Sequence, residues 1–263
     1  MTATVSELQR AWRALQEGAF REGFTDESAA DPAPGVWHPE PAERVLPVVG
    51  AQPGIGTTVM ALALATVSAP SRVVECAGLG VGGLAAAPTA ELGERGPWVR
   101  GSRADVIVDR LADTPIDPTG VAFPPLLDRI SHLTVLDVSW DPAIFLLTTG
   151  WLANLVLATA PVVVVGVATV PGLRRLENTL SGLGPDRCVA AIVGPPRRRW
   201  ARCLIPGPET NGLIRSGRLF PIPVVPALHV AGADATDLPG PLLAVARDVI
   251  VATDLHPFGK DLS

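Results

Sequence analysis

Val45 to Ala69 reads VLPVVGAQPGIGTTVMALALATVSA, and this stretch decides the fold. Its apolar start, 45–49, is typical of a buried strand, and 57–67 has the composition of an apolar helix. A glycine-rich turn joins the two. Such a strand–turn–helix unit directs backbone N–H groups and the positive end of the helix dipole toward one point. We expect that point to suit a phosphate group.

The rest of the chain repeats the alternation of apolar strands and helices. We predict further strands at 72–76, 104–108, 134–138, 161–167, 188–193 and 221–225, and helices at 144–157, 173–183 and 241–252. Alternation of this kind predicts βαβ units and a parallel sheet. Because the strands are apolar throughout, we expect helices on both faces of the sheet. The sequence therefore predicts a three-layer α/β domain with a mostly parallel sheet over residues 44–263.

The first 43 residues have a different composition. Thr4 and Glu7 form a capping-box pattern, and Leu8, Trp12, Leu15 and Phe20 recur at the spacing of one helical face. Residues 23–43 combine acidic side chains with four prolines, a composition that does not bury enough apolar surface to fold alone. We expect a short N-terminal helix and a linker in 1–43.

Composition excludes several classes of protein. The net charge of −5 argues against nonspecific coating of nucleic acid, which needs a basic surplus. Three distant cysteines predict neither a disulfide framework nor a zinc site, and the scattered histidines add no metal motif. The uncharged run 142–173 contains Pro161, so we expect a helix and a strand there rather than a membrane span. With no secretory signal at the N-terminus, a cytoplasmic location is expected.

The glycine-rich turn has the spacing of a nucleotide-binding loop. Gly54, Ile55, Gly56, Thr57 and Thr58 match the end of a Walker A motif when Thr57 occupies the lysine position. The Thr58 hydroxyl then occupies the position that holds magnesium. The alternative is that the glycines only permit a tight turn.

This loop resembles the deviant Walker A motif of the ParA/MinD-like P-loop ATPases, K-G-G-x-G-K-[ST]-[ST]. Gln52 stands at the signature lysine and Thr57 at the second lysine, and the single lysine of the chain is Lys260. The strand 134–138 resembles the Walker B strand of the group. The resemblance implies that Asp137 and Thr58 would hold magnesium if ATP binds.

Other positions depart from that group. Ala77 stands where the group has the aspartate that positions the attacking water, and Gly194 where it commonly has an asparagine that reads adenine. Val225 replaces the acidic residue of a late "IP-x-D" segment. We therefore expect hydrolysis to be weak or lost, unless Arg174 or Arg175 supplies the missing positive charge.

The resulting hypothesis is a degenerate ParA/MinD-like scaffold or adaptor, in DNA partition, conjugative transfer or positioning at the cell pole or septum. One alternative is an active ATP-dependent switch that forms homodimers and uses an arginine for the lysine. Another is a dinucleotide-binding oxidoreductase, because Gly78, Gly80 and Gly83 follow a strand and precede a predicted helix at 84–92.

A basic cluster provides a candidate partner surface. It consists of Arg197, Arg198, Arg199, Trp200 and Arg202, just after a predicted strand. Arginine grips phosphates and tryptophan stacks on bases, so DNA, an acidic protein or a nucleotide are candidate partners. The alternative is a solvated loop in which Trp200 packs on the domain. A membrane is not an expected partner.

Overall fold

The computed structural model describes residues 35–39, 43–78, 80, 82–128, 131–159 and 161–254. The chain separates into two units, Met1–Gly35 and Val36–Ser263. The helix predicted near the N-terminus lies outside the described residues, and so does most of the linker. The architecture below concerns the second unit.

A nine-stranded sheet forms the middle layer, in the order β3-β4-β5-β2-β6-β1-β7-β8-β9. The strands are β1 (Arg44–Gly50), β2 (Ser71–Glu75), β3 (Ala90–Arg95), β4 (Trp98–Arg103), β5 (Val106–Leu111), β6 (Leu133–Val138), β7 (Val162–Val167), β8 (Cys188–Val193) and β9 (Leu219–Ile222). All pairs from β5 to β9 are parallel, whereas β4 pairs antiparallel with both β3 and β5.

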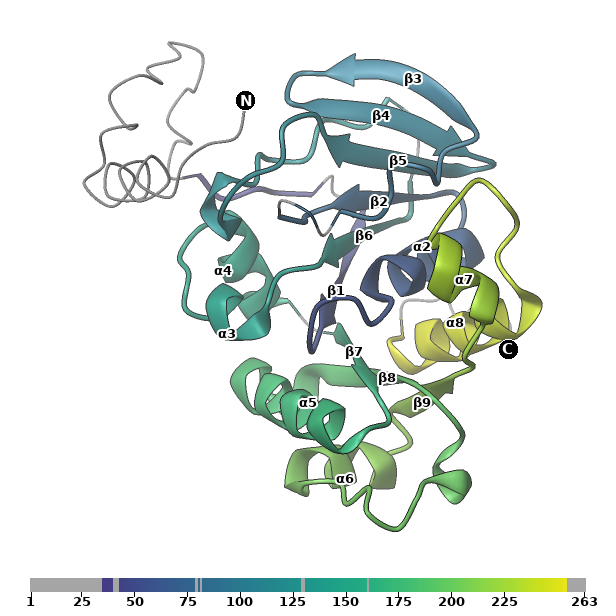
Figure 1. Cartoon of the computed structure of the whole chain (residues 1–263). Helices are drawn as coiled ribbons and strands as arrows, with labels where there is room; N and C mark the ends of the chain where they lie inside the picture. Colours follow the sequence, from purple (N-terminus) through teal and green to yellow (C-terminus); the bar gives the residue numbers. More distant parts are fainter. Residues whose placement is uncertain are drawn as a thin grey trace, which may run out of the picture. The chain divides into compact units, whose positions relative to one another are not determined.

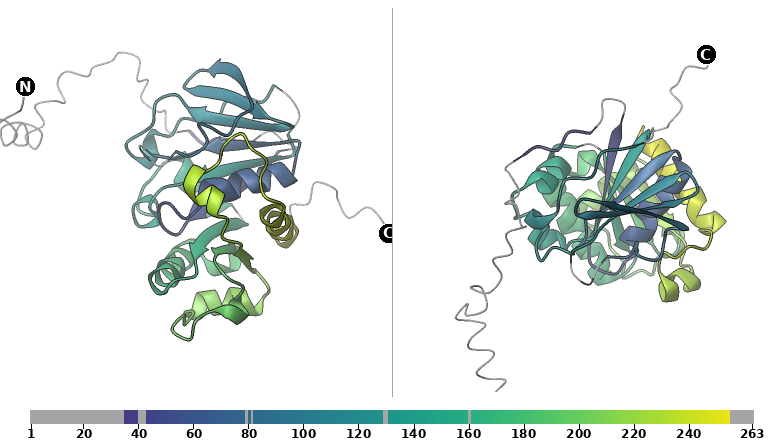
Figure 2. Two further views of the ribbon diagram at one scale, coloured as in Figure 1. Left: turned by 45° about the vertical axis from the view of Figure 1, so that its right-hand side comes forward. Right: turned by 90° about the horizontal axis from the view of Figure 1, so that it is seen from above.

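Helices cover both faces of this sheet (Figures 1 and 2). On one face lie α2 (Thr57–Val67), α7 (Pro226–Ala231) and α8 (Gly240–Ala252), and on the other α3 (Pro142–Phe145), α4 (Trp151–Ala158), α5 (Val170–Leu183) and α6 (Pro208–Arg215). Each face has its own apolar core, one centred on α2 and α8 and one on α4 and α5. The predicted three-layer α/β class with a mostly parallel sheet is therefore confirmed.

The central unit forms for the reasons that its sequence indicates. The last five residues of β1 are buried, and α2 begins and ends where its composition predicts, at Thr57 and Val67. The alanines and leucines of 61–65 are all fully buried, because α2 is enclosed by the sheet and by α8. None of the described helices is long and apolar enough to cross a membrane.

Two helix predictions are wrong. The helix expected at 144–157 is divided into α3 and α4, because Gly150 adopts φ 136° and Leu147 turns its side chain to solvent. The helix expected at 84–92 is absent: residues 84–89 are loop and 90–95 form β3. Strand β3 instead pairs with β4 as an antiparallel hairpin, and the Gly96-Pro97 turn joins the two strands.

Strands β3 and β4 were not predicted, because β4 buries charges. Its buried side chains include Trp98, Arg100 and Arg103, and Arg100 is 0% exposed. The Arg100 guanidinium donates to both carboxylate oxygens of Asp109 on β5, at 2.7 and 3.0 Å. An arginine-rich strand resembles a solvated segment when only its sequence is read. The edge strand β3 is exposed along its whole length.

The Arg100–Asp109 pair gives a stability prediction. Asp109→Ala removes the buried carboxylate that pairs with both Arg100 and Arg72, and it leaves Arg100 only its ion pair with the exposed Asp128. Removing one partner of a buried ion pair typically costs about 3–5 kcal/mol. Glu91→Ala removes the exposed carboxylate that accepts from Arg110, and we expect a loss of about 0–1 kcal/mol. Urea denaturation measures both. Equal losses in the two variants would contradict the structural role assigned to the buried pair.

Candidate functional site

The candidate site lies where the direction of the chain connections changes. After β1 the chain runs to α2 on one face of the sheet, and after β6 it runs to α3 on the other face (Figure 1). Strands β1 and β6 are parallel neighbours, so a crevice opens between their carboxyl ends. Open α/β sheets bind ligands at such switch points.

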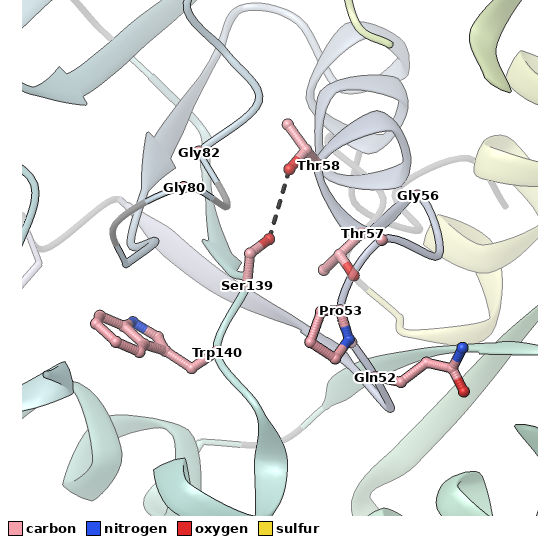
Figure 3. A pocket seen from close by; sticks show the side chains of 11 residues that line it. Gln52, Pro53, Gly56, Thr57, Thr58, Gly80, Gly82, Ser139 and Trp140 are labelled. Atoms are coloured by element: carbon pink, nitrogen blue, oxygen red, sulfur yellow. Dashed lines mark hydrogen bonds between the residues drawn. The ribbon is translucent and has the colours of Figure 1, made fainter. Parts of the chain in front are cut away.

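A cavity of about 230 Å³ occupies this crevice, and we call it the loop cavity. It is lined by Gly50, Gln52, Pro53, Gly54, Gly56, Thr57, Thr58, Gly80, Gly82, Ser139 and Trp140, from the ends of β1, β2 and β6 (Figure 3). Gly54 and Gly56 have φ of 74° and 91°, which L side chains rarely adopt. No side chain caps the start of α2, so its first N–H groups have no side-chain acceptor.

Of the two predicted magnesium-binding residues, Thr58 lines the loop cavity, whereas Asp137 is fully buried and does not line it. The hydroxyls of Thr58 and Ser139 are 3.4 Å apart (Figure 3), and the Ser139 hydroxyl donates to Asp137 Oδ1 at 2.7 Å. Thr58 and Asp137 are thus joined through Ser139. Hydroxyl and carboxylate oxygens are the ligands that magnesium prefers. These side chains fit the resemblance, although no cation is needed to hold them together.

Asp137 is fully buried, and its Oδ2 atom has no hydrogen-bond partner. Burial raises the pKa of Asp137 to about 7, while the hydrogen bond from Ser139 opposes the shift and the nearby Glu75 carboxylate adds to it. A carboxylate with one unsatisfied oxygen in an apolar setting is costly to ionise. The group therefore exchanges a proton in the neutral pH range.

The loop cavity contains no positively charged side chain. Among the described residues that line it there is no lysine, arginine or histidine. Thr57 is 6% exposed, and its hydroxyl lies where a Cβ on Gly50 would be, so its side chain fills the base of the turn. Arg175 does not line the cavity, but its Nη1 donates to Oε1 of the lining residue Gln52 at 3.0 Å. Arg174 is exposed and makes no such contact in the described part of the chain.

The residues that follow β2 place no carboxylate at the position of the water-orienting aspartate. Cys76 and Ala77 are 0% and 2% exposed, and burial raises the pKa of the Cys76 thiol well above its ordinary value. Glu75 holds the loop that follows β2, because its Oε1 accepts a hydrogen bond from the backbone N–H of Leu84 at 2.9 Å. The position at which the resembling ATPases orient water thus holds a buried methyl group.

Gly194 must be glycine in this backbone. Its φ is 145°, and an added Cβ would lie 2.7 Å from the Cβ of Ala168. An asparagine that reads adenine would need the turn after β8 to rebuild. The difference from the ParA/MinD-like pattern at this position is therefore conformational as well as chemical.

The basic cluster does not join the loop cavity. Arg197–Arg199 form a 3₁₀ turn after β8, and the side chains of Arg197, Arg198, Arg199 and Arg202 are exposed. None of the four has a side-chain hydrogen bond or ion pair within the described residues. Trp200 is half-buried against the α5 face, and its indole N–H donates to Pro195 O at 3.0 Å. Trp200 therefore anchors the turn that presents the arginines.

The glycines proposed for a dinucleotide have other roles. The Trp140 ring lies against Gly78, where an added Cβ would be 2.5 Å from a ring carbon. Gly80 has φ 77°, and Gly83 packs against Thr58. No helix follows these glycines, so the helix N-terminus that a dinucleotide-binding turn requires is missing here.

A second hollow adjoins the loop cavity and was not predicted. This apolar groove has a volume of about 550 Å³ and shares Gln52, Gly54 and Gly56 with the loop cavity. Its other lining residues are Ile55, Val59, Met60, Val167, Thr169, Val193, Ile222, Pro223, Val224, Val225, Leu228, His229, Gly232 and Leu242. Ile55, predicted to bind nucleotide, lines this groove instead of the loop cavity. The apolar run 222–225 was the sequence signal that could have indicated it.

Ser139 and Trp140 were also missed as site residues. Both follow Asp137 directly at the end of β6, so their place at the carboxyl edge of the sheet was their sequence signal. Neither a scan against models of known protein families nor a search of curated proteins found a match to this chain. The function is therefore inferred from the site itself.

The buried Asp137 gives a pH prediction. Its pKa of about 7 is above the unfolded value, so the native state binds the extra proton, and stability falls as pH rises from about 4 to about 7. Asp137→Asn removes this penalty, which reaches about 4 kcal/mol at full ionisation. We expect the stability of the variant relative to the native chain to increase by about 2 kcal/mol between pH 5 and pH 8.

Urea denaturation at the two pH values measures this change. Asp248→Asn, on an exposed position of α8, is the control and should show no comparable trend. A constant difference between Asp137→Asn and the native chain across this range would contradict the assignment.

Proposed function

We propose that this chain is a degenerate ParA/MinD-like protein that acts as a cytoplasmic scaffold or adaptor and hydrolyses ATP weakly or not at all. Partition of DNA, conjugative transfer and positioning at the cell pole or septum are the processes that such a protein would serve. The observation that carries the proposal is a nucleotide-type loop whose cavity has no positive side chain among the described residues.

Electrostatics supports the loss of hydrolysis. Transfer of a phosphoryl group depends on positive groups that stabilise charge on its oxygens. Here the loop cavity is lined by neutral residues, and the carboxyl groups of Asp137 and Glu75 lie near one another behind it. A triphosphate would meet backbone N–H groups and neutral side chains, without a cation from the lining residues. Ala77 supplies only a buried methyl group at the position where the resembling ATPases have the aspartate that positions the attacking water.

The arginine turn supports a role in binding a partner. Four exposed arginines within six residues contrast with the net charge of −5 of the whole chain. Because Trp200 fixes the turn, the arginines are presented together at the carboxyl edge of the sheet. Their chemistry suits DNA phosphates or an acidic protein surface.

Restoring the lysine tests the proposal. Thr57→Lys places an ammonium at the cavity, and charge-assisted contacts worth about 1.5–3 kcal/mol should tighten Mg-ATP binding about 10- to 150-fold. Titration calorimetry measures binding, and release of inorganic phosphate measures hydrolysis. We expect the native chain to show no ATP hydrolysis that depends on Asp137, so Asp137→Ala should not lower the rate of phosphate release. We expect Thr57→Lys to bind Mg-ATP without hydrolysing it efficiently.

Thr66→Lys, on the same helix away from the loop, is the matched control and should not change binding. Hydrolysis by the native chain that disappears in Asp137→Ala would overturn the degenerate assignment. Thr57→Lys without any gain in Mg-ATP affinity would contradict the phosphate-loop interpretation.

The Arg175–Gln52 contact favours a second candidate, an ATP-dependent dimerising switch. Gln52 stands at the signature lysine position, and its hydrogen bond holds a guanidinium beside the loop. Under this candidate, Mg-ATP doubles the mass measured by light scattering, Arg175→Gln abolishes the change and Arg174→Gln retains it. An unchanged mass at saturating Mg-ATP would exclude this switch.

A further inference from the structure

The apolar groove is a feature of the fold that nucleotide chemistry leaves unexplained. Its floor is the top of the core beneath α2 and α8, where Met60, Ile222 and Leu242 are at most 6% exposed. One wall is formed by α7, a short helix with no fully buried residue. At about 550 Å³ the groove falls within the size range of small-molecule sites.

The polar side chains of the groove have little capacity to read a base. The Thr169 hydroxyl caps α5 by accepting from Gly172 N at 3.1 Å, and the Gln52 carbonyl oxygen accepts from Arg175. His229 is exposed at the rim. A purine or pyrimidine buried here would leave its polar edge without dedicated partners, which is costly. The groove therefore selects apolar surface and shape.

The end of the groove next to the loop has a different character. Gln52, Gly54 and Gly56 line both the groove and the loop cavity, so the two hollows are continuous in their lining. Arg175 lies at this junction and is exposed, with one N–H group on Gln52. An occupant of the groove thus meets apolar walls along its body and a guanidinium near one end.

We infer that the groove binds a small amphiphile, an acyl- or isoprenyl-type chain with an anionic head. The apolar chain lies between α2, α7 and the ends of β7, β8 and β9, and the head lies beside Gln52 and Arg175. This site is independent of whether the loop hydrolyses ATP. Through this site the proposed scaffold would respond to a small amphiphile.

A chain-length series tests the site. Octyl, decyl and dodecyl phosphate, used as monomers below their micelle concentrations, are titrated into the full chain by calorimetry. Each buried methylene is worth about 0.8 kcal/mol, so each two-carbon step should tighten binding about 15-fold until the groove is filled. Binding must also raise the melting temperature, since a ligand of the folded state stabilises it.

Two pairs of variants locate the probe. Val225→Trp fills the half-buried wall and should remove the chain-length dependence, whereas Val251→Trp, at a 59% exposed position of α8 outside the groove, should retain it. Arg175→Gln should weaken decyl phosphate at least fivefold and leave 1-octanol unchanged, and Arg174→Gln should alter neither. Melting curves of all four variants verify that they fold.

Two outcomes would overturn the inference. One is an affinity independent of chain length in the native chain. The other is displacement of decyl phosphate by ADP at lower concentrations than by dodecyl phosphate, because the groove would then be a base site. If Val225→Trp does not fold, Val224→Asp, at a 63% exposed groove position, replaces it and must weaken all three phosphates relative to Val251→Asp.

Discussion

The close contact between Gly50 and Thr57 is the constraint on which the rest of the site depends. A Cβ at Gly50 would collide with the Thr57 hydroxyl, so the chain can return from β1 into α2 only because this position lacks a side chain. That return places the start of α2 over the carboxyl end of the central strand. The loop cavity and the apolar groove both open around it, and Gln52, Gly54 and Gly56 line both.

The charges around this turn are mainly acidic, and the described residues that line the loop cavity include no positive side chain. The turn leaves the first N–H groups of α2 without a side-chain acceptor, but the groups behind it are the buried Asp137 and the partly buried Glu75, and Arg175 lies outside the loop cavity. A protein under pressure to bind phosphate would place a cation at Thr57.

Much of the fold could be predicted because its apolar segments are continuous. Helix α2 was predicted with its exact bounds, and β1, β6 and β8 were predicted within one residue or less at most ends. The β3–β4 hairpin could not be predicted, because β4 buries Arg100 and Arg103 through pairing with Asp109 and backbone carbonyls that only the fold brings near. The division between α3 and α4 depended on Gly150, whose φ is not readable from composition.

For the site, the sequence predicted that the glycines, Thr57, Thr58 and Asp137 come together. It did not predict Ser139, which connects Thr58 to Asp137. The apolar groove could not be predicted, because the sequence alone does not show that residues 222–225 lie beside α2. Strand β3 forms one edge of the sheet and bears on how the protein could associate. Its six residues are all exposed and include the charged Glu91, Glu94 and Arg95. Its pairing with β4 is irregular, with a register shift between Glu91 and Gly93. An edge of this kind resists pairing with a second sheet. The fold thus protects this edge of the sheet against pairing with a strand from a second molecule.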